Sequence, residues 1–225
     1  MLSGPILEAL WQQLNKRMPE SEATDIMNAV RDEVLKPYSK ADLRILNNYI
    51  SKCSACKNVD YDRKTALFNT TDPLACIVLQ RPNIGSEASE LLMTSLDEAG
   101  FNKSNISLTY LNKCFPKSGR TTSEQTNNCR HFLDDELFSM KPKIIIACGK
   151  EVATEMIGPI EKISTLRGSV AWSGNYGVLV TYSPSYLVAN GRNETYISQF
   201  VSDLKLAYQN CYSNNNQKES NTNYG

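Results

Sequence analysis

The chain has 225 residues, of which 41% are hydrophobic and 21% charged, so it is long enough for one good-sized globular domain, and its composition excludes disordered and fibrous classes. Its 24 basic and 24 acidic residues cancel, so any affinity for nucleic acid must come from a local patch of charge. No run approaches the roughly 18 apolar residues that span a bilayer, and the first residues lack the pattern of a secretion signal, so we expect a cytoplasmic protein with no membrane partner.

Residues 1–39 are expected to form an N-terminal helical extension. Apolar residues recur there at steps of three and four, which predicts two amphipathic helices; they are Ile6, Leu7, Leu10, Leu14, Ile26, Val30 and Val34. Trp11 lies between Leu10 and Leu14 in the sequence. This stripe could dock on a protein partner, although an aromatic residue on an apolar stripe more often belongs to a core.

Residues 40–212 alternate between helical and strand patterns. Four apolar runs are typical of buried strands, at residues 75–79, 106–111, 143–148 and 177–181. Helical patterns precede, separate and follow them, at 39–53, 89–99, 123–140, 150–157 and 195–208. The alternation predicts an α/β fold, a three-layer αβα sandwich with a small, mostly parallel sheet. The polar tail over 213–225 is expected to be disordered.

Functional loops are expected where the parallel strands end, because ligands of such sheets bind at the carboxyl edge. The loops at this edge are predicted at residues 80–85, 112–120, 148–150 and 182–187.

The seven cysteines divide into two groups. Cys53 and Cys56 form a C-x-x-C pair at a helix end, and Cys114 and Cys129 supply a second pair. Four thiolates suit a tetrahedral Zn²⁺ or a [4Fe-4S] cluster, whereas four unrelated buried thiols would fit the spacing as well. Packing explains the remaining three, which are Cys76, Cys148 and Cys211.

A set of short motifs follows one another in a specific order. They are Cys53-x-x-Cys56, Lys113-Cys114-Phe115-Pro116 with Arg120, Cys129, the 141–149 segment KPKIIIACG, Leu166-Arg167-Gly168 and the 181–187 segment TYSPSYL. In order and spacing, residues 40–210 resemble family 4 uracil-DNA glycosylases, the [4Fe-4S] type. The resemblance implies a uracil-DNA-glycosylase-like fold, a [4Fe-4S] cluster on Cys53, Cys56, Cys114 and Cys129, and DNA binding across the strand ends.

The catalytic motifs of that family are substituted in this chain. Excision of a flipped base requires a group that positions water and a donor that stabilises the departing base. Where the family has G-E-[AG]-P-G, residues 79–83 read LQRPN, so Gln80 replaces the carboxylate. Where the family has H-P-S-Y-L, Ser183 replaces the histidine. The one histidine of the chain, His131, follows an expected cluster ligand and is interpreted as structural or exposed.

The family's base-reading residues differ as well. In T-N-x-x-K-C the asparagine position is occupied by Tyr110, and a strand bulge would be needed to bring Asn112 into that place. The family's G-R-P-F-V-G stretch, with its stacking phenylalanine, is absent because Ile84 and Gly85 follow the first loop at once.

Two main hypotheses follow from these substitutions. The first is a DNA-binding or replication and repair module that has lost uracil excision. Its DNA contacts would be Arg81, Lys113, Lys117, Arg120, Arg167, Ser183, Ser185 and Tyr186; the alternative for each charged residue is ordinary solvated surface. The second is an active DNA glycosylase of altered base specificity that uses Gln80, Arg81, Tyr110 and Ser183 in new roles.

Overall fold

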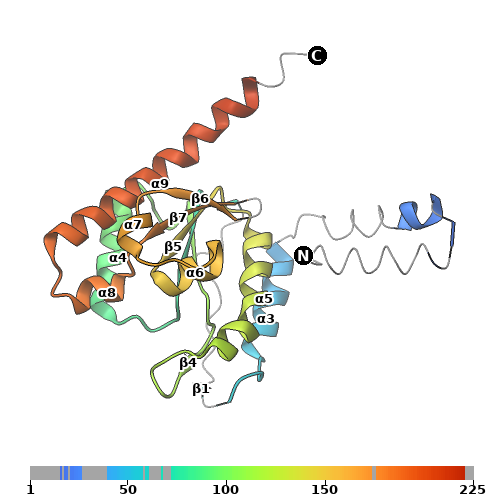
Figure 1. Ribbon diagram of the computed structural model, residues 1–225, viewed down its shortest axis with the longest axis horizontal. Coiled ribbons are helices and arrows are strands. Elements are labelled where there is room, and N and C mark those ends of the chain that lie inside the picture. The colour runs from blue at the N-terminus through green and yellow to red at the C-terminus, as the bar shows by residue number, and fades with distance from the viewer. Residues whose placement is uncertain are drawn as a thin grey trace.

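A computed structural model of the chain describes residues 16, 18, 19, 21–26, 40–57, 59, 60, 67, 72–173 and 176–220 (Figure 1). Its strands are β1 (Val59–Asp60), β2 (Ala75–Leu79), β3 (Ile106–Tyr110), β4 (Phe115–Pro116), β5 (Ile144–Cys148), β6 (Val170–Ser173) and β7 (Tyr176–Thr181). Its named helices are α3 (Lys40–Ser51), α4 (Ser86–Glu98), α5 (Ser123–Met140), α6 (Lys150–Ile157), α7 (Ile163–Leu166), α8 (Pro184–Ala189) and α9 (Glu194–Ser220).

Five strands form the central sheet in the order β3-β2-β5-β7-β6. The four strands from β3 to β7 run parallel, and only β6 runs antiparallel to its neighbour β7. All residues of β2, β3 and β5 are buried, as the apolar runs predict for strands covered on both faces. The mostly parallel sheet of the sequence prediction is confirmed.

Helices cover both faces of the sheet, which makes three layers (Figure 1). On one face, Leu92 of α4 and Phe200 of α9 pack against alternate strand residues such as Ile77. On the other, Leu133 of α5 and Val152 of α6 belong to a second core with the intervening strand residues. Each fully buried aliphatic or Phe side chain stabilises the fold by roughly 1.5–3 kcal/mol. The predicted sandwich is therefore present, with its core divided by the sheet.

Several elements differ from the sequence prediction. The edge strand β6 and the short helix α7 were not predicted, and the segment after β7, expected as a loop, forms α8. Ser183 caps α8 by accepting the Tyr186 N–H, and Pro184 occupies the first turn, a combination typical of a helix start. Helix α9 continues through residues 213–220, where the sequence predicts a disordered tail.

In the N-terminal extension the structure describes a helix at residues 21–26. The predicted docking stripe of Leu10, Trp11 and Leu14 lies outside the described residues. None of the helices in the described part of the chain combines the length and apolarity needed to cross a membrane.

Candidate DNA-binding and base-excision site

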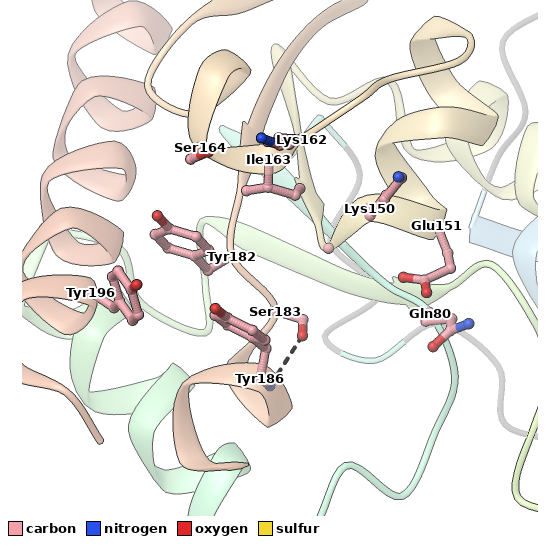
Figure 2. A pocket seen from close by; sticks show the side chains of 11 residues that line it. Gln80, Lys150, Glu151, Lys162, Ile163, Ser164, Tyr182, Ser183, Tyr186 and Tyr196 are labelled. Atoms are coloured by element: carbon pink, nitrogen blue, oxygen red, sulfur yellow. Dashed lines mark hydrogen bonds between the residues drawn. The ribbon is translucent and has the colours of Figure 1, made fainter. Parts of the chain in front are cut away.

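A pocket of about 560 Å³ opens at the carboxyl edge of the sheet, where sequence analysis places the functional loops. Its walls come from the ends of β2, β5 and β7 and from α6, α7, α8 and α9. It is lined by Gln80, Gly149, Lys150, Glu151, Lys162, Ile163, Ser164, Tyr182, Ser183, Tyr186 and Tyr196. Figure 2 shows the three tyrosines along one wall and Gln80, Lys150 and Glu151 along the opposite one.

Gln80 and Ser183, two of the three positions that the motif comparison predicts to be substituted, both line this pocket. Gln80 directly follows β2, and Ser183 lies just beyond β7 with its Oγ 3.2 Å from the Tyr186 nitrogen. Gly149 lets the 148–150 loop approach Ser183: its φ is +100°, and an added Cβ would lie 3.2 Å from the Cβ of Ser183. Any side chain at position 149 would therefore be strained and would crowd Ser183.

Tyr110, the third position predicted to be substituted, lies elsewhere. Its ring is 7% exposed and lines a second pocket of about 560 Å³, with Leu79, Ile84 and Leu108 among its neighbours. Burial raises the pKa of the Tyr110 hydroxyl above its ordinary value. The structure therefore brings Gln80 and Ser183 together but places Tyr110 in a separate, more apolar cavity.

Asn112 does not take the place of the family asparagine through a bulge. The β2–β3 register is continuous up to Leu79 opposite Tyr110, and the Asn112 backbone N–H donates to the Gln80 carbonyl. The Asn112 side chain is buried and donates to Thr126 Oγ1 at 3.3 Å. Asn112 lines neither of the two pockets.

Lys113, predicted as a DNA contact, is instead part of the core. Its side chain is 1% exposed, and its Nζ donates to Glu136 Oε2 at 2.5 Å, Thr109 Oγ1 at 2.9 Å and the Tyr110 carbonyl at 2.7 Å. Thr109 in turn donates to Glu136, which is fully buried. The DNA-contact prediction for Lys113 was wrong because a buried ammonium needs a partner, and α5 supplies one.

Arg167 is also committed to a partner inside the protein. Its Nε and Nη2 donate to the two carboxylate oxygens of Asp203 at 3.0 and 2.5 Å, and Nη2 also donates to the Gln199 carbonyl. Thr181 donates a further hydrogen bond to Asp203 at 2.6 Å. Burial raises the pKa of the Asp203 carboxyl above its ordinary value, against the lowering effects of Thr181 and Arg167. This pairing gives Arg167 a structural role. Its side chain is 19% exposed, and the phosphate contact stays a prediction.

The other predicted DNA contacts lie at the surface of this edge. Arg81 stacks over the Phe115 ring at 4.7 Å and donates to the Gly119 carbonyl, so it joins the 80–85 loop to the 112–120 loop. Lys117 and Arg120 on the second loop are exposed, as are Ser185 and Tyr186 on α8.

Sequence analysis missed five pocket residues of chemical interest. They are Lys150, Glu151, Lys162, Tyr182 and Tyr196. Lys150 and Glu151 begin the helix after β5, where a charged first turn reads as ordinary capping. Lys150 is the last residue of the predicted loop at 148–150 and Glu151 follows it, which was the signal that could have marked them.

The predicted cluster ligands come from three segments. Cys53 and Cys56 are half-buried beyond the end of α3, Cys114 is buried in the loop after β3, and Cys129 is buried on α5. Burial raises the pKa of the Cys129 thiol, and the charges of Cys56 and Cys53 raise this pKa further. The hydrogen bond that the thiol accepts from the Lys113 backbone N–H lowers it. Cys129 therefore lies near the C-x-x-C pair and against the residue that precedes Cys114.

None of these thiols forms a disulfide. Within the described part of the chain, no three His, Cys, Asp or Glu side chains are grouped tightly enough to hold a single metal ion. The other three cysteines are buried, and burial raises the pKa of Cys148 to about 12 and that of Cys211 to about 11. Such thiols stay protonated, in agreement with the structural role predicted for Cys148 and Cys211.

A comparison with protein families matches residues 58–205 to the uracil DNA glycosylase superfamily. The chain belongs to this superfamily. The matched segment contains all five strands of the central sheet and every residue of the carboxyl-edge pocket, whereas Cys53 and Cys56 precede it.

Two type-4 uracil-DNA glycosylases are similar to this chain over most of its length. A type-4 uracil-DNA glycosylase of Thermotoga maritima is 28% identical over 172 residues, which cover 70% of this chain and 89% of that protein. A type-4 uracil-DNA glycosylase of Pyrobaculum aerophilum is 25% identical over 187 residues, which cover 74% of this chain and 93% of that protein. The family resemblance inferred from the motifs is confirmed.

Proposed function

We propose that this glycosylase-superfamily protein binds DNA at the carboxyl edge of its sheet and has lost efficient uracil excision. The observation that carries the proposal is the pocket itself, because Gln80 and Ser183 both line it. An amide cannot accept a proton from water at neutral pH, and a hydroxyl cannot offer the charge of an imidazolium. Loss of one such group typically slows catalysis by about 100- to 1,000-fold.

The rest of the chain offers no imidazole to this pocket. His131 is the one histidine in the sequence. It lies exposed on α5 with its ring against Phe132, and it is not among the residues that line the pocket. A proton donor for the leaving base would therefore have to be a hydroxyl, an ammonium or the protonated carboxyl of Glu151.

DNA binding is supported by the side chains that remain at this edge. Lys117 and Arg120 are exposed on the 112–120 loop, and Lys150 and Lys162 flank the pocket. Arg81, Ser183, Ser185 and Tyr186 complete the predicted contact surface. Cations of this kind bind phosphates independently of the DNA sequence. Because the chain has no overall positive charge, its affinity for DNA would come from this local group of cations.

We further propose that Cys53, Cys56, Cys114 and Cys129 hold a [4Fe-4S] cluster. The donor set is all thiolate. Cys129 accepts the Lys113 backbone N–H and interacts electrostatically with Cys53 and Cys56. An all-thiolate set also suits Zn²⁺. The resemblance of the motifs to the [4Fe-4S] type of glycosylase favours the cluster. Bound there, it would join α3, α5 and the 112–120 loop.

A second function is favoured by one residue that the motif comparison overlooks. Glu151 places a carboxylate in the pocket beside Gln80 (Figure 2). This side chain could position the attacking water in place of the missing acidic residue. The second candidate is therefore an active glycosylase of altered specificity, with Glu151 as the general base.

An excision panel separates the two functions. Oligonucleotides containing uracil, xanthine or hypoxanthine are incubated with the wild type and with Glu151→Gln, treated with alkali and examined for strand cleavage. The proposed function predicts retained DNA affinity that falls with salt and no cleavage of any substrate. Cleavage by the wild type that Glu151→Gln abolishes would establish the second function instead, and the absence of DNA affinity at low salt would refute the first.

A further inference from the structure

Helix α5 carries an amide side chain that contacts one of the proposed cluster ligands without being a ligand itself. Asn128 Nδ2 donates to Cys56 Sγ at 3.6 Å, between residues that are 72 positions apart in the sequence. Asn128 directly precedes Cys129, another proposed ligand, on the same helix. This amide therefore joins the C-x-x-C segment to the helix that holds Cys129.

The C-x-x-C segment lies near the surface of the protein. Cys53 is held by the end of α3, because its backbone N–H donates to the Ile50 carbonyl at 3.1 Å. The next two residues are exposed, and Cys56 is half-buried. The hydrogen bond from Asn128 thus fixes the sulfur of the second cysteine of the pair to the body of the domain.

A second hydrogen bond links α5 to the 112–120 loop. Cys129 accepts it from the Lys113 backbone N–H, and Lys113 directly precedes Cys114. The Lys113 ammonium is paired with Glu136, which also lies on α5, at 2.5 Å. Two of the four proposed ligands therefore accept N–H groups of the protein, one from a backbone amide and one from a side chain.

A donor to a cysteine sulfur has its largest effect when that sulfur is a thiolate. A neutral thiol is a weak acceptor, whereas hydrogen bonds to ionised groups are roughly twice as strong as neutral ones. A cysteine that ligates a metal is a thiolate, so the Asn128 amide contributes most in the metal-bound protein. Reduction of an iron–sulfur centre adds negative charge, and a donor to a ligand sulfur therefore favours the reduced state.

We propose that Asn128 is a positioning residue of the cluster site, whose amide holds Cys56 beside Cys129 and raises the reduction potential by hydrogen bonding to the Cys56 sulfur. The inference rests on the proposed [4Fe-4S] cluster and goes beyond it, because Asn128 is not a ligand. Substitution of residues that orient metal ligands typically lowers metal affinity by about 10- to 100-fold. Retention of iron should therefore depend on Asn128 as well as on the four cysteines.

The test compares the anaerobically purified full-length protein with three variants. Asn128→Leu keeps a side chain of similar size but removes the donor, and Asn128→Gln keeps the amide with one more methylene. Asn127→Leu is the matched control, because Asn127 is the exposed neighbour on the same helix. Iron and sulfide per chain, the rate of iron release to a chelator and the reduction potential are measured for each protein. Circular dichroism verifies that each variant folds.

We expect Asn128→Leu to release iron about tenfold faster than the wild type. Its equilibrium constant for one-electron reduction should fall about tenfold, which corresponds to a potential about 59 mV more negative. Asn128→Gln should lie closer to the wild type than Asn128→Leu does, and Asn127→Leu should match the wild type. A folded Asn128→Leu protein without iron, beside an iron-loaded Asn128→Gln, would support the same role.

The outcomes distinguish this inference from the cluster proposal beneath it. A wild type that binds no iron would overturn both. An iron-loaded Asn128→Leu protein with the wild-type release rate and potential would overturn the role of Asn128 while the cluster stands. Faster iron release with an unchanged potential would overturn the hydrogen bond to the sulfur, because loss of packing alone would explain it.

Discussion

Replacement of Lys113 by methionine tests its assignment to the core instead of the DNA surface. The substitution leaves the Glu136 carboxylate buried without the ammonium that lies 2.5 Å from it. Breaking one side of a buried ion pair costs about 3–5 kcal/mol, and we expect the lower end because the Thr109 hydroxyl still donates to Glu136. For a protein of this size each kcal/mol shifts Tm by about 2–4 °C, so Tm should fall by about 6–12 °C.

Thermal unfolding followed by circular dichroism measures this shift, with Lys117→Met as the matched control. Lys117 lies on the same loop but is exposed, so its variant should melt within about 1–2 °C of the wild type because surface substitutions cost little. A second substitution, Glu136→Gln, should recover most of the stability that Lys113→Met loses, since it removes the unpaired charge. A Lys113→Met protein with wild-type Tm and weakened DNA binding would refute the reasoning.

Three further predictions concern the site and its supports. The double variant Gln80→Glu, Ser183→His should raise single-turnover uracil excision at least about tenfold, as restored charge stabilisation implies; no gain in a folded, DNA-binding protein would contradict the roles given to these positions. Cys129→Ser should remove most of the iron and the visible absorbance of the purified protein, whereas the buried Cys211→Ser should retain both; equal iron contents would count against the ligand assignment. Burial raises the folded-state pKa of Asp203, so the contribution of this carboxyl to stability is present at low pH and is lost as pH rises from about 3.9 through that raised pKa. Urea unfolding across this pH range should show a decline in the free energy of unfolding that is weaker in Asp203→Asn. Parallel pH curves for the two proteins would contradict the assigned shift.

The sheet could be predicted because its strands are short apolar runs covered on both faces. Ala75–Leu79 has the same bounds in the prediction and in the structure. Helix α5 also begins as predicted, since Thr122 and Gln125 form a reciprocal capping box before Ser123. The edge strand Val170–Ser173 was missed because its half-exposed residues carry neither a continuous apolar run nor a clear alternation.

The partners of the charged residues could not be predicted from local patterns. Lys113 finds Glu136 23 residues away, and Arg167 finds Asp203 36 residues away. Both pairs form only when α5 and α9 pack on the sheet. The contact between Tyr182 and Tyr196 in the carboxyl-edge pocket has the same origin, because the two rings meet through the turn of the chain around α8. Sequence motifs therefore identified the family and the edge of the sheet, whereas the division between structural and exposed charges required the packed structure.

The central claim is that this superfamily member binds DNA without excising uracil. A single-turnover assay tests it most directly, with enzyme in excess over uracil-containing single- and double-stranded DNA. Binding to undamaged DNA and the visible absorbance of the protein are recorded in the same samples. We predict salt-dependent binding with no abasic product from either substrate. Rapid formation of abasic product would contradict the account and show that Gln80, Glu151 and Ser183 form a working active site.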